Sequence, residues 1–257
     1  MKKFFAFASL LALALSACSD DAAQGELKGE GRVAISCVAA TNVDVTRADI
    51  SCTTPAFEDF AIKIDGVSHT YSAEYADFAE FYAEEGNYLY HGSYKATVIA
   101  GDINEEGYDK ATFVGRKEFS VEARKETTVD ITAYIANALV KVEVTEAFEK
   151  YFAEGYSLTL TSAAGNEFEV TEQTDPLFIA PVSFTISGTA TKQPNQSGAE
   201  GTVVTLPEFK KESLAAQTMY TVKLDVEDAG SATLTITLND DLVATFDIEQ
   251  ELNDNAQ

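Results

Sequence analysis

The chain has 257 residues, 46% of them hydrophobic, and its 18 basic and 42 acidic residues give a formal net charge of −24. This charge excludes nucleic-acid binding, because a protein that neutralises phosphates needs a basic patch and the sequence has none. The hydrophobic content is sufficient for one or two folded domains. The acidity keeps such a protein soluble but does not specify a partner.

The N-terminus has the three parts of a secretion signal. Lys2 and Lys3 give it a positive start, an apolar run extends from Phe4 to Leu15, and small residues follow. The run is shorter than the about 20 apolar residues that a membrane-spanning helix needs. We therefore expect an exported protein whose residues 1–17 are a signal peptide.

Leu15-Ser16-Ala17-Cys18 closes this signal and resembles the bacterial lipobox. The resemblance implies that Cys18 is acylated and becomes the first residue of the mature protein. Acyl chains contribute about 0.8 kcal/mol per buried methylene, so several chains hold a protein on a bilayer. The alternative is an ordinary secretion signal in which the cysteine has no role. A covalent lipid is thus the expected membrane anchor, and no other cofactor is expected.

An acidic stretch follows the cysteine. Ser19, Asp20 and Asp21 resemble the export signal of Bacteroidetes lipoproteins, which implies an outer-membrane protein that faces the cell exterior. Residues 18–27 are expected to form a lipidated tether. The alternative to an export signal is that these residues are only part of a generic hydrophilic linker from Cys18 to Glu26, because small polar residues are typical of any flexible linker. In that case the anchored protein faces the periplasm.

Apolar and polar residues alternate through the first half of the mature chain, which predicts half-buried strands. The alternating segments are 33–37, 60–64, 67–71, 94–98, 119–121 and 129–131. Asp65-Gly66 joins two of them, and this pair favours a tight hairpin turn. Gly92-Ser93-Tyr94 resembles the tyrosine corner of Greek-key sandwiches, and the simpler alternative is that Tyr94 is an ordinary strand aromatic.

The alternation continues in the second half. Its segments are 140–144, 158–160, 168–170, 182–186, 220–226, 234–238 and 242–248, and residues 239–241 form the turn between the last two. Phe148, Tyr151 and Phe152 are three and four residues apart, which predicts a short helix over 146–152. The stretch from Gly188 to Gly201 is rich in small polar residues and predicts a long mobile loop that could contact a partner.

Together these segments predict an all-β protein with two tandem Greek-key or immunoglobulin-like β-sandwich domains. We place the domains at residues 28–133 and 134–252, with the boundary near Tyr134, where one series of strands ends and the next begins. No long linker rich in proline and glycine separates them, so the two domains are expected to abut.

Two cysteines remain once Cys18 is acylated. Cys37 lies in phase with Val33 and Ile35 and is expected to face the core, and Cys52 follows it in the chain. Disulfides form readily outside the cytoplasm, so a bond between Cys37 and Cys52 is one alternative. Two buried free thiols are the other, and the sequence favours neither.

The sequence has no motif that indicates catalysis or a zinc site. His69 and His91 are the only histidines, and no cysteine or carboxylate stands at zinc-ligand spacing from them. Nucleophile elbows, phosphate-binding loops and metalloprotease helices do not occur. The 42 carboxylates make chance acid pairs unavoidable, so they do not support a glycosidase. We predict that the protein is not an enzyme and has no metal site.

One acidic loop begins like a calcium site. Asp102, Glu105 and Glu106 supply oxygen ligands, but the twelfth position, which should be a glutamate, is Phe113. A weak calcium contact at this loop or at residues 239–241 stays open. The favoured alternative is a pair of solvated acidic turns.

Six tyrosines fall within a short span: Tyr71, Tyr75, Tyr82, Tyr88, Tyr90 and Tyr94. Tyrosine offers rigid contact area at a small entropy cost, so an exposed cluster would predict a recognition surface. Packing in the core is the simpler alternative. The chain has no tryptophan, which weakens the interpretation as a dedicated carbohydrate-binding domain.

Several of these elements, taken in order, resemble an uncharacterised family of Bacteroidetes cell-surface lipoproteins that contain a domain of unknown function. The elements are the strand from Gly29 to Ile35, Thr46-Arg47-Ala48, Phe60-x-Ile62-x-Ile64, Gly92-Ser93-Tyr94, Phe119-x-Val121, the segment from Ala136 to Val142, and Phe148 to Phe152. The resemblance implies export, a lipid anchor and β-sandwich domains. It supplies no catalytic residues.

A looser similarity exists to the fimbrillin-like pilus subunits of the same bacteria. In those subunits an Arg-specific protease removes the first strand, and a strand of a neighbour fills the groove. Arg47 lies at a suitable place for such a cut, although a lone arginine is usually only a surface residue. The leading hypothesis is a non-enzymatic surface lipoprotein that binds, adheres or scaffolds, with an unknown protein or glycan partner. The alternative is a pilus subunit or accessory cleaved after Arg47.

Overall fold

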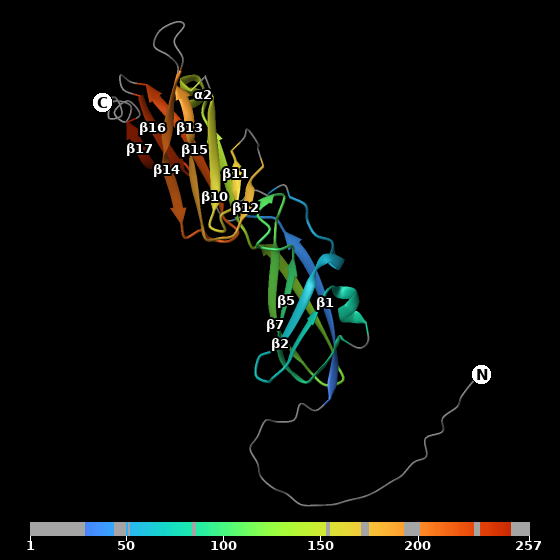
Figure 1. The fold of residues 1–257 in the computed structure, drawn as a ribbon. Helices are drawn as coiled ribbons and strands as arrows, with labels where there is room; N and C mark the ends of the chain where they lie inside the picture. The colour runs from blue at the N-terminus through green and yellow to red at the C-terminus, as the bar shows by residue number, and fades with distance from the viewer. Residues whose placement is uncertain are drawn as a thin grey trace, which may run out of the picture.

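The computed structural model describes residues 29–43, 50, 52–83, 86–152, 155–170, 175–192, 201–228 and 232–247. These residues form the all-β fold that the sequence predicts, with two short α-helices and one 3-10 helix beside the strands. No helix among them is long and apolar enough to span a membrane. Figure 1 shows the strands gathered in two parts that lie end to end.

The first part contains eight strands and two short helices. The strands are β1 (Glu30–Ala40), β2 (Ala61–Gly66), β3 (Ser72–Tyr75), β4 (Tyr88–Tyr90), β5 (Gly92–Ala100), β6 (Gly107–Tyr108), β7 (Phe113–Val121) and β8 (Glu126–Ile135). The 3-10 helix η1 (Phe57–Asp59) precedes β2, and α1 (Phe78–Tyr82) follows β3. Seven of the strands form one sheet in the order β3-β2-β5-β7-β8-β1-β4.

This sheet folds over to enclose a single core. β7 and β8 pair at Phe113 and Val114, and the Thr127 hydroxyl donates to the Ser120 carbonyl at 3.3 Å near the turn that joins them. β1 pairs with β8 in parallel from Arg32 to Ala40, while β5 pairs with the whole of β7. Residues from opposite ends of the sheet, such as Ile64 and Leu89, then meet in one hydrophobic cluster. The fold therefore builds two packed layers from one continuous sheet.

Tyr94 forms a tyrosine corner between β4 and β5. Its side chain is fully buried, and its hydroxyl donates a hydrogen bond to the backbone carbonyl of Tyr90, four residues upstream, at 2.8 Å. Burial also raises the pKa of the Tyr94 phenol. The corner interpretation is confirmed, and the interpretation of Tyr94 as an ordinary strand aromatic is wrong, because the hydroxyl holds the backbone where the chain passes from β4 to β5.

Tyr94→Phe is expected to lower the free energy of unfolding by about 1–2 kcal/mol, because it removes a buried hydrogen bond and keeps the ring. Urea denaturation of the two proteins measures the difference. Tyr134→Phe is the matched control, since Tyr134 is exposed on β8, and it should change the stability by less than about 0.5 kcal/mol. Equal stability of Y94F and the parent protein would show that the corner does not hold the fold.

β2 and β3 form the expected hairpin, but its turn is displaced. Asp65 pairs with Ser72, and the Gly66 amide donates to the Tyr71 carbonyl at 2.9 Å, so the loop lies beyond Asp65-Gly66. The prediction of a tight turn at Asp65-Gly66 is wrong. A Cβ on Gly66 would lie only 2.9 Å from the Nε2 atom of His69. The glycine thus makes room for the returning loop and does not form the turn itself.

The second part contains nine strands and one helix. The strands are β9 (Ala138–Val144), β10 (Tyr156–Ser162), β11 (Glu167–Glu169), β12 (Leu177–Ile179), β13 (Ser183–Lys192), β14 (Thr202–Glu212), β15 (Met219–Asp228), β16 (Ala232–Leu238) and β17 (Asp241–Asp247). Four of them form one sheet, β11-β10-β13-β14, and the other five join β6 of the first part in a six-stranded sheet, β17-β16-β15-β9-β12-β6. Side chains from both sheets share the second hydrophobic cluster. This part is therefore a sandwich of two sheets.

Helix α2 (Glu146–Tyr151) confirms the short helix predicted between β9 and β10. Thr145 is its N-cap, and the Thr145 hydroxyl oxygen accepts a hydrogen bond from the Phe148 amide at 3.2 Å. Phe148 and Phe152 are buried, with ring centroids 4.8 Å apart. The helix therefore seals its aromatic face into the second core.

The alternation pattern does not reveal β14. Its first residues include two consecutive valines, Val203 and Val204, and Pro207 interrupts the strand at a register shift opposite β13. An edge strand tolerates proline at such a place, because no ladder donor is needed there.

Gly188 to Lys192 belong to β13, so the predicted loop over 188–201 is too long. Residues 193–200 lie outside the described part of the chain.

β16 and β17 form the predicted hairpin with one unexpected change of face. Asn239 and Asp240 have φ of 51° and 69°, as a two-residue hairpin turn requires. A register shift after Ile236 places Leu242 opposite Thr237 and leaves Leu242 64% exposed. The expectation that Leu242 faces the core is therefore wrong. Val182, another predicted core residue, is also exposed because it precedes β13.

The two cores meet at a junction held by hydrogen bonds. The side-chain oxygen of Asn137, which is fully buried, accepts from the Thr112 amide at 2.6 Å. Gln217 donates its backbone amide to the Asn137 carbonyl at 2.8 Å and its side-chain amide to the Asn42 carbonyl at 3.0 Å. β6 leaves the first part of the chain and pairs with β12 in the second. The two-domain boundaries of 28–133 and 134–252 stay a prediction, since these segments interlock.

Candidate functional site

The residues predicted to anchor, export or process the protein are not in the described part of the chain. Cys18, Ser19, Asp20 and Asp21 precede Gly29, where the description begins, and Arg47 falls between Val43 and Ile50. The lipid anchor, the export signal and the proteolytic site therefore stay predictions from the sequence. The structure places the residues that follow each of them.

Both remaining cysteines are free thiols in the structure. Cys37 is buried in β1, as its phase predicts, and Cys52 is partly buried before η1. Burial raises the pKa of Cys37 to about 11, and burial together with the charge of Asp109 raises the pKa of Cys52. Both groups therefore stay protonated near neutral pH, where they are weak nucleophiles. Of the two alternatives that the sequence leaves open, the structure has the free thiols.

The carboxylates of the acidic loop have structural partners. Glu106 accepts hydrogen bonds at 2.8 Å from the Asn166 side chain and from the Ala180 amide, so it joins the first part of the protein to the second. Glu105 forms an ion pair with Lys110 at 3.1 Å. Among the described residues, no group of three or more His, Cys, Asp or Glu side chains could hold a metal ion. A weak calcium contact at this loop stays a prediction.

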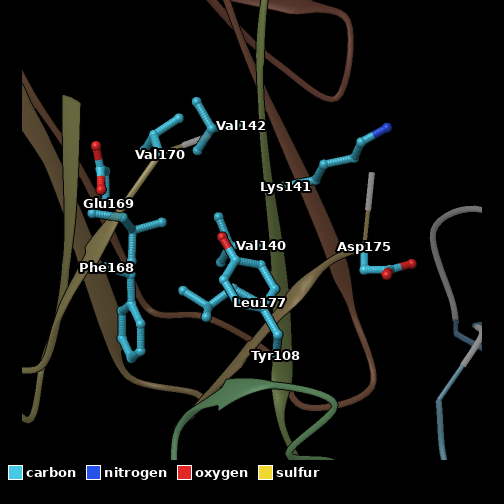
Figure 2. A pocket seen from close by; sticks show the side chains of 10 residues that line it. Tyr108, Val140, Lys141, Val142, Phe168, Glu169, Val170, Asp175 and Leu177 are labelled. Carbon is cyan, nitrogen blue, oxygen red and sulfur yellow. The ribbon is translucent and has the colours of Figure 1, made fainter. Parts of the chain in front are cut away.

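A small cavity lies between the two sheets of the second part (Figure 2). Tyr108, Val140 and Leu177 gather at its centre, with Lys141 and Asp175 on one side and Phe168 to Val170 on the other. Its volume is about 20 Å³, which admits one water molecule. Ligand pockets are typically more than ten times larger, at about 300–1,000 Å³. This cavity is therefore a packing gap beside β6, β11 and β12 and not a substrate site.

A larger hollow of about 420 Å³ lies on the outer face of β15, β16 and β17. We call this surface the outer polar face. It is lined by four threonines, three acidic residues, one lysine and one leucine: Thr233, Thr235, Thr237, Thr245, Asp225, Glu227, Asp240, Lys223 and Leu242. Hydroxyls and carboxylates on neighbouring strands suit a partner that offers many hydrogen bonds, such as a sugar or a polar protein surface.

The strand pattern explains how the outer polar face forms. On β16, Leu234 and Ile236 are buried, so the intervening threonines point outward. Thr235 stands between Asp225 on β15 and Thr245 on β17 in the register of the sheet. The Asp225 carboxylate also accepts a hydrogen bond from the hydroxyl of Thr145, the N-cap of α2, at 2.5 Å. The face is therefore a fixed array of polar side chains on three paired strands.

The sequence contains a signal for this face that the positions of the apolar residues alone do not reveal. Thr233, Thr235 and Thr237 alternate with the apolar residues of the same strand. A run of threonines in that phase predicts a polar outer surface of a sheet.

The tyrosine cluster is divided between the core and the surface. Tyr94 is buried, Tyr71 and Tyr75 are partly buried, and Tyr82, Tyr88 and Tyr90 are exposed. The Tyr82 hydroxyl forms 2.8 Å hydrogen bonds with the amide and the carbonyl of Ile35, so this residue closes part of the edge of β1. Tyr88 and Tyr90 occupy alternate positions on β4 and share its outer face. Core packing thus explains only part of the cluster.

Three solved structures from Bacteroides are similar to this chain. A candidate cell adhesion protein from Bacteroides fragilis is 11% identical, with a TM-score of 0.37 over 85% of this chain and 99% of that one. Candidate polysaccharide-binding proteins from Bacteroides thetaiotaomicron are 11% identical, with a TM-score of 0.41 over 86% and 99%. A candidate cell adhesion protein from Bacteroides eggerthii is 7% identical, with a TM-score of 0.38 over 82% and 95%.

No curated protein matches the chain. The model of one protein family matches residues 29–254, which is most of the sequence and includes both hydrophobic cores. That family is described as a domain of unknown function, in agreement with the resemblance found in the sequence. The chain therefore belongs to the family of the domain of unknown function DUF4493.

Proposed function

We propose that the protein is a non-enzymatic, lipid-anchored protein of the outer cell surface that binds a glycan or protein partner through its second part. The lipobox at Cys18 and the acidic residues after it support the anchor and the outward orientation. The outer polar face supports the binding role, because it offers aligned hydroxyls and carboxylates to a polar partner.

The observation that carries this proposal is the distance between the two ends of the molecule. β1 begins at the end farthest from β16 and β17, and the chain enters the fold just before β1 (Figure 1). The junction through Asn137, Gln217 and Glu106 ties the two parts to each other. An anchor at Cys18 would therefore hold the first part near the membrane and present the outer polar face away from it.

Thr235→Arg tests the binding role. The new side chain would fill the centre of the hollow and change its charge, so we expect a bound partner to lose at least about tenfold in affinity, or about 1.4 kcal/mol. The measurement is binding of the purified mature protein to an immobilised panel of polysaccharides and extracellular proteins, with the parent protein defining which member of the panel binds.

Thr205→Arg is the matched control. Thr205 is exposed on β14, in the other sheet, and lies outside the lining of the hollow. The proposal expects T205R to bind like the parent protein and T235R to bind weakly. Equal binding of both variants would exclude the outer polar face as the site.

A second candidate function, the pilus subunit, is favoured by the position of β1. This strand precedes Arg47, contributes Val33, Ile35 and Cys37 to the first core, and pairs with β8 over nine positions. A cut after Arg47 would free β1 from the rest of the chain and leave a groove that a strand of another subunit could fill. A mature protein that begins at Ala48 supports this candidate, and one that begins at Cys18 supports the surface-binding protein.

A further inference from the structure

We propose that the end of the first part nearest the tether rests on the surface of the bilayer that holds the lipid anchor. This tether end consists of four segments, 29–32, 66–71, 88–93 and 120–126. The inference rests on the lipid anchor of the proposed function and adds which face of the protein meets the lipid headgroups.

Backbone hydrogen bonds join the four segments at the start of β1. The His91 amide donates to the Gly29 carbonyl at 2.9 Å, and the Arg124 amide donates to the Glu30 carbonyl at 2.7 Å. The Val67 amide donates to the Ser93 carbonyl at 2.9 Å, which brings in the loop after β2. The tyrosine corner from Tyr94 fixes the adjacent carbonyl of Tyr90. The tether end is thus a connected surface.

Large apolar side chains are exposed on this surface. Tyr90 is 50% exposed and Tyr88 is 46% exposed on the outer face of β4, and Val67 is 53% exposed in the neighbouring loop. Tyrosine has an apolar ring and a polar hydroxyl, and it is enriched where proteins meet the boundary between lipid and water. Burial of these rings among headgroups would remove apolar area from water while the hydroxyls stay hydrated.

The net charge of the tether end suits a membrane surface better than the net charge of the whole chain does. Its charged residues are Glu30, Arg32, Glu122, Arg124, Lys125 and Glu126, which are three acidic and three basic residues, so their net charge is 3 − 3 = 0. The whole chain has a net charge of −24. Bilayers that contain anionic lipids repel acidic surfaces. The neutral end therefore lacks the net negative charge that such a bilayer would repel.

The length of the tether keeps this end close to the anchor. Cys18 and Gly29 are 29 − 18 = 11 residues apart, which spans at most roughly 40 Å of extended chain. Arg32 of β1 pairs with β4 at the tether end, and Ala40 at the far end of β1 pairs with Tyr134. These two residues of β1 are eight positions apart, so the far end lies roughly 26 Å farther along the strand. The tether is attached at this end, so the tether end of an anchored protein reaches the bilayer more readily than the far end of β1 does.

The absence of tryptophan from the chain allows a direct test. Tyr90→Trp introduces a single indole at the tether end, and Tyr134→Trp introduces one at a position of similar exposure, 43%, at the far end of β8. The acylated mature proteins are reconstituted in vesicles of phosphatidylcholine and phosphatidylglycerol that include brominated phosphatidylcholine. We expect the Y90W emission to shift to the blue and to be quenched by the bromine atoms, and the Y134W emission to stay unchanged.

A second reporter keeps the test independent of one substitution. The emission of Val67→Trp should also be quenched in these vesicles. Adding Y88S and Y90S to the V67W protein should relieve that quenching while the protein still floats with the vesicles. Emission from Y90W and V67W that matches the emission of the lipid-free proteins would overturn the proposal. It would also leave the exposed tyrosines as a contact for a soluble partner.

Flotation separates failure of the docking from failure of the anchor. Protein that floats with the vesicles and shows no quenching keeps its anchor and contradicts only the docking of the tether end. Protein that is not acylated in cells and does not float contradicts the anchor, and it removes with it the reason for placing this end at the bilayer.

Discussion

Cys18→Ala is expected to move nearly all of the protein from the membrane fraction to the soluble fraction. The reason is that the lipobox thiol is the only group predicted to carry acyl chains, each of which contributes about 0.8 kcal/mol per buried methylene. Fractionation of cells that express each variant, followed by immunodetection, gives the measurement.

Cys52→Ser is the control for this experiment, because it also removes a thiol but leaves the lipobox intact. Cys52 is only partly buried and forms no disulfide, so the variant should fold and remain in the membrane fraction. A C18A protein that stays with the membrane would contradict lipid anchoring and would require another attachment, such as a tightly held partner.

Gly188→Ala is expected to lower the free energy of unfolding by roughly 3 kcal/mol, because the site has no room for a side chain. A Cβ at this position would overlap the backbone carbonyl oxygen of Ser157 and lie 2.9 Å from the Cα atom of Leu158. These are backbone atoms of the paired strand β10 and cannot move aside without breaking the sheet. Thermal or urea unfolding of the purified protein measures the loss.

Gly165→Ala provides the comparison, since it separates a steric clash from backbone strain. Gly165 has a φ of +84°, and a Cβ at this position would have no heavy atom within 4 Å, so only the left-handed backbone disfavours alanine there. That strain costs about 1–2 kcal/mol. A loss in G188A no larger than the loss in G165A would show that β10 and β13 do not pack closely at Gly188.

Much of the fold follows from the alternation of apolar residues. Val33, Ile35 and Cys37 are buried on one face of β1, as their spacing predicts, and the aromatic spacing around Phe148 predicts α2. Alternation is informative wherever one face of a strand meets the core and the other meets solvent. These elements are therefore set by local sequence.

The elements that the sequence does not reveal depend on contacts with distant segments. β12 is buried on both faces, so Leu177 to Ile179 show no alternation, and helix α1 is a single short turn. The register shift beside Leu242 depends on the pairing of β16 with β17. The hairpin at Gly66 is displaced because His69 packs over the glycine. Tertiary packing overrides the local pattern at each of these places.

The candidate sites divide in a similar way. The lipobox at Cys18 is a contiguous motif, so the sequence alone predicts it. The outer polar face combines side chains from β15, β16 and β17, and only the strand order brings Asp225, Thr235 and Thr245 together. The tether end likewise depends on hydrogen bonds between segments far apart in the chain. The threonines of β16 indicate a polar strand face, but no local motif predicts which side chains of β15 and β17 join it, and none predicts the tether end.

Mass spectrometry of the mature protein purified from cell membranes decides whether the chain is a lipid-anchored surface protein. We expect the N-terminal peptide to begin at Cys18 and to carry the added mass of fatty acyl chains on that residue. An unmodified Cys18 would contradict the lipid anchor. A mature chain that begins at Ala48 would contradict the proposal of a lipid-anchored binding protein. It would support the second candidate, a pilus subunit that loses β1 by cleavage after Arg47.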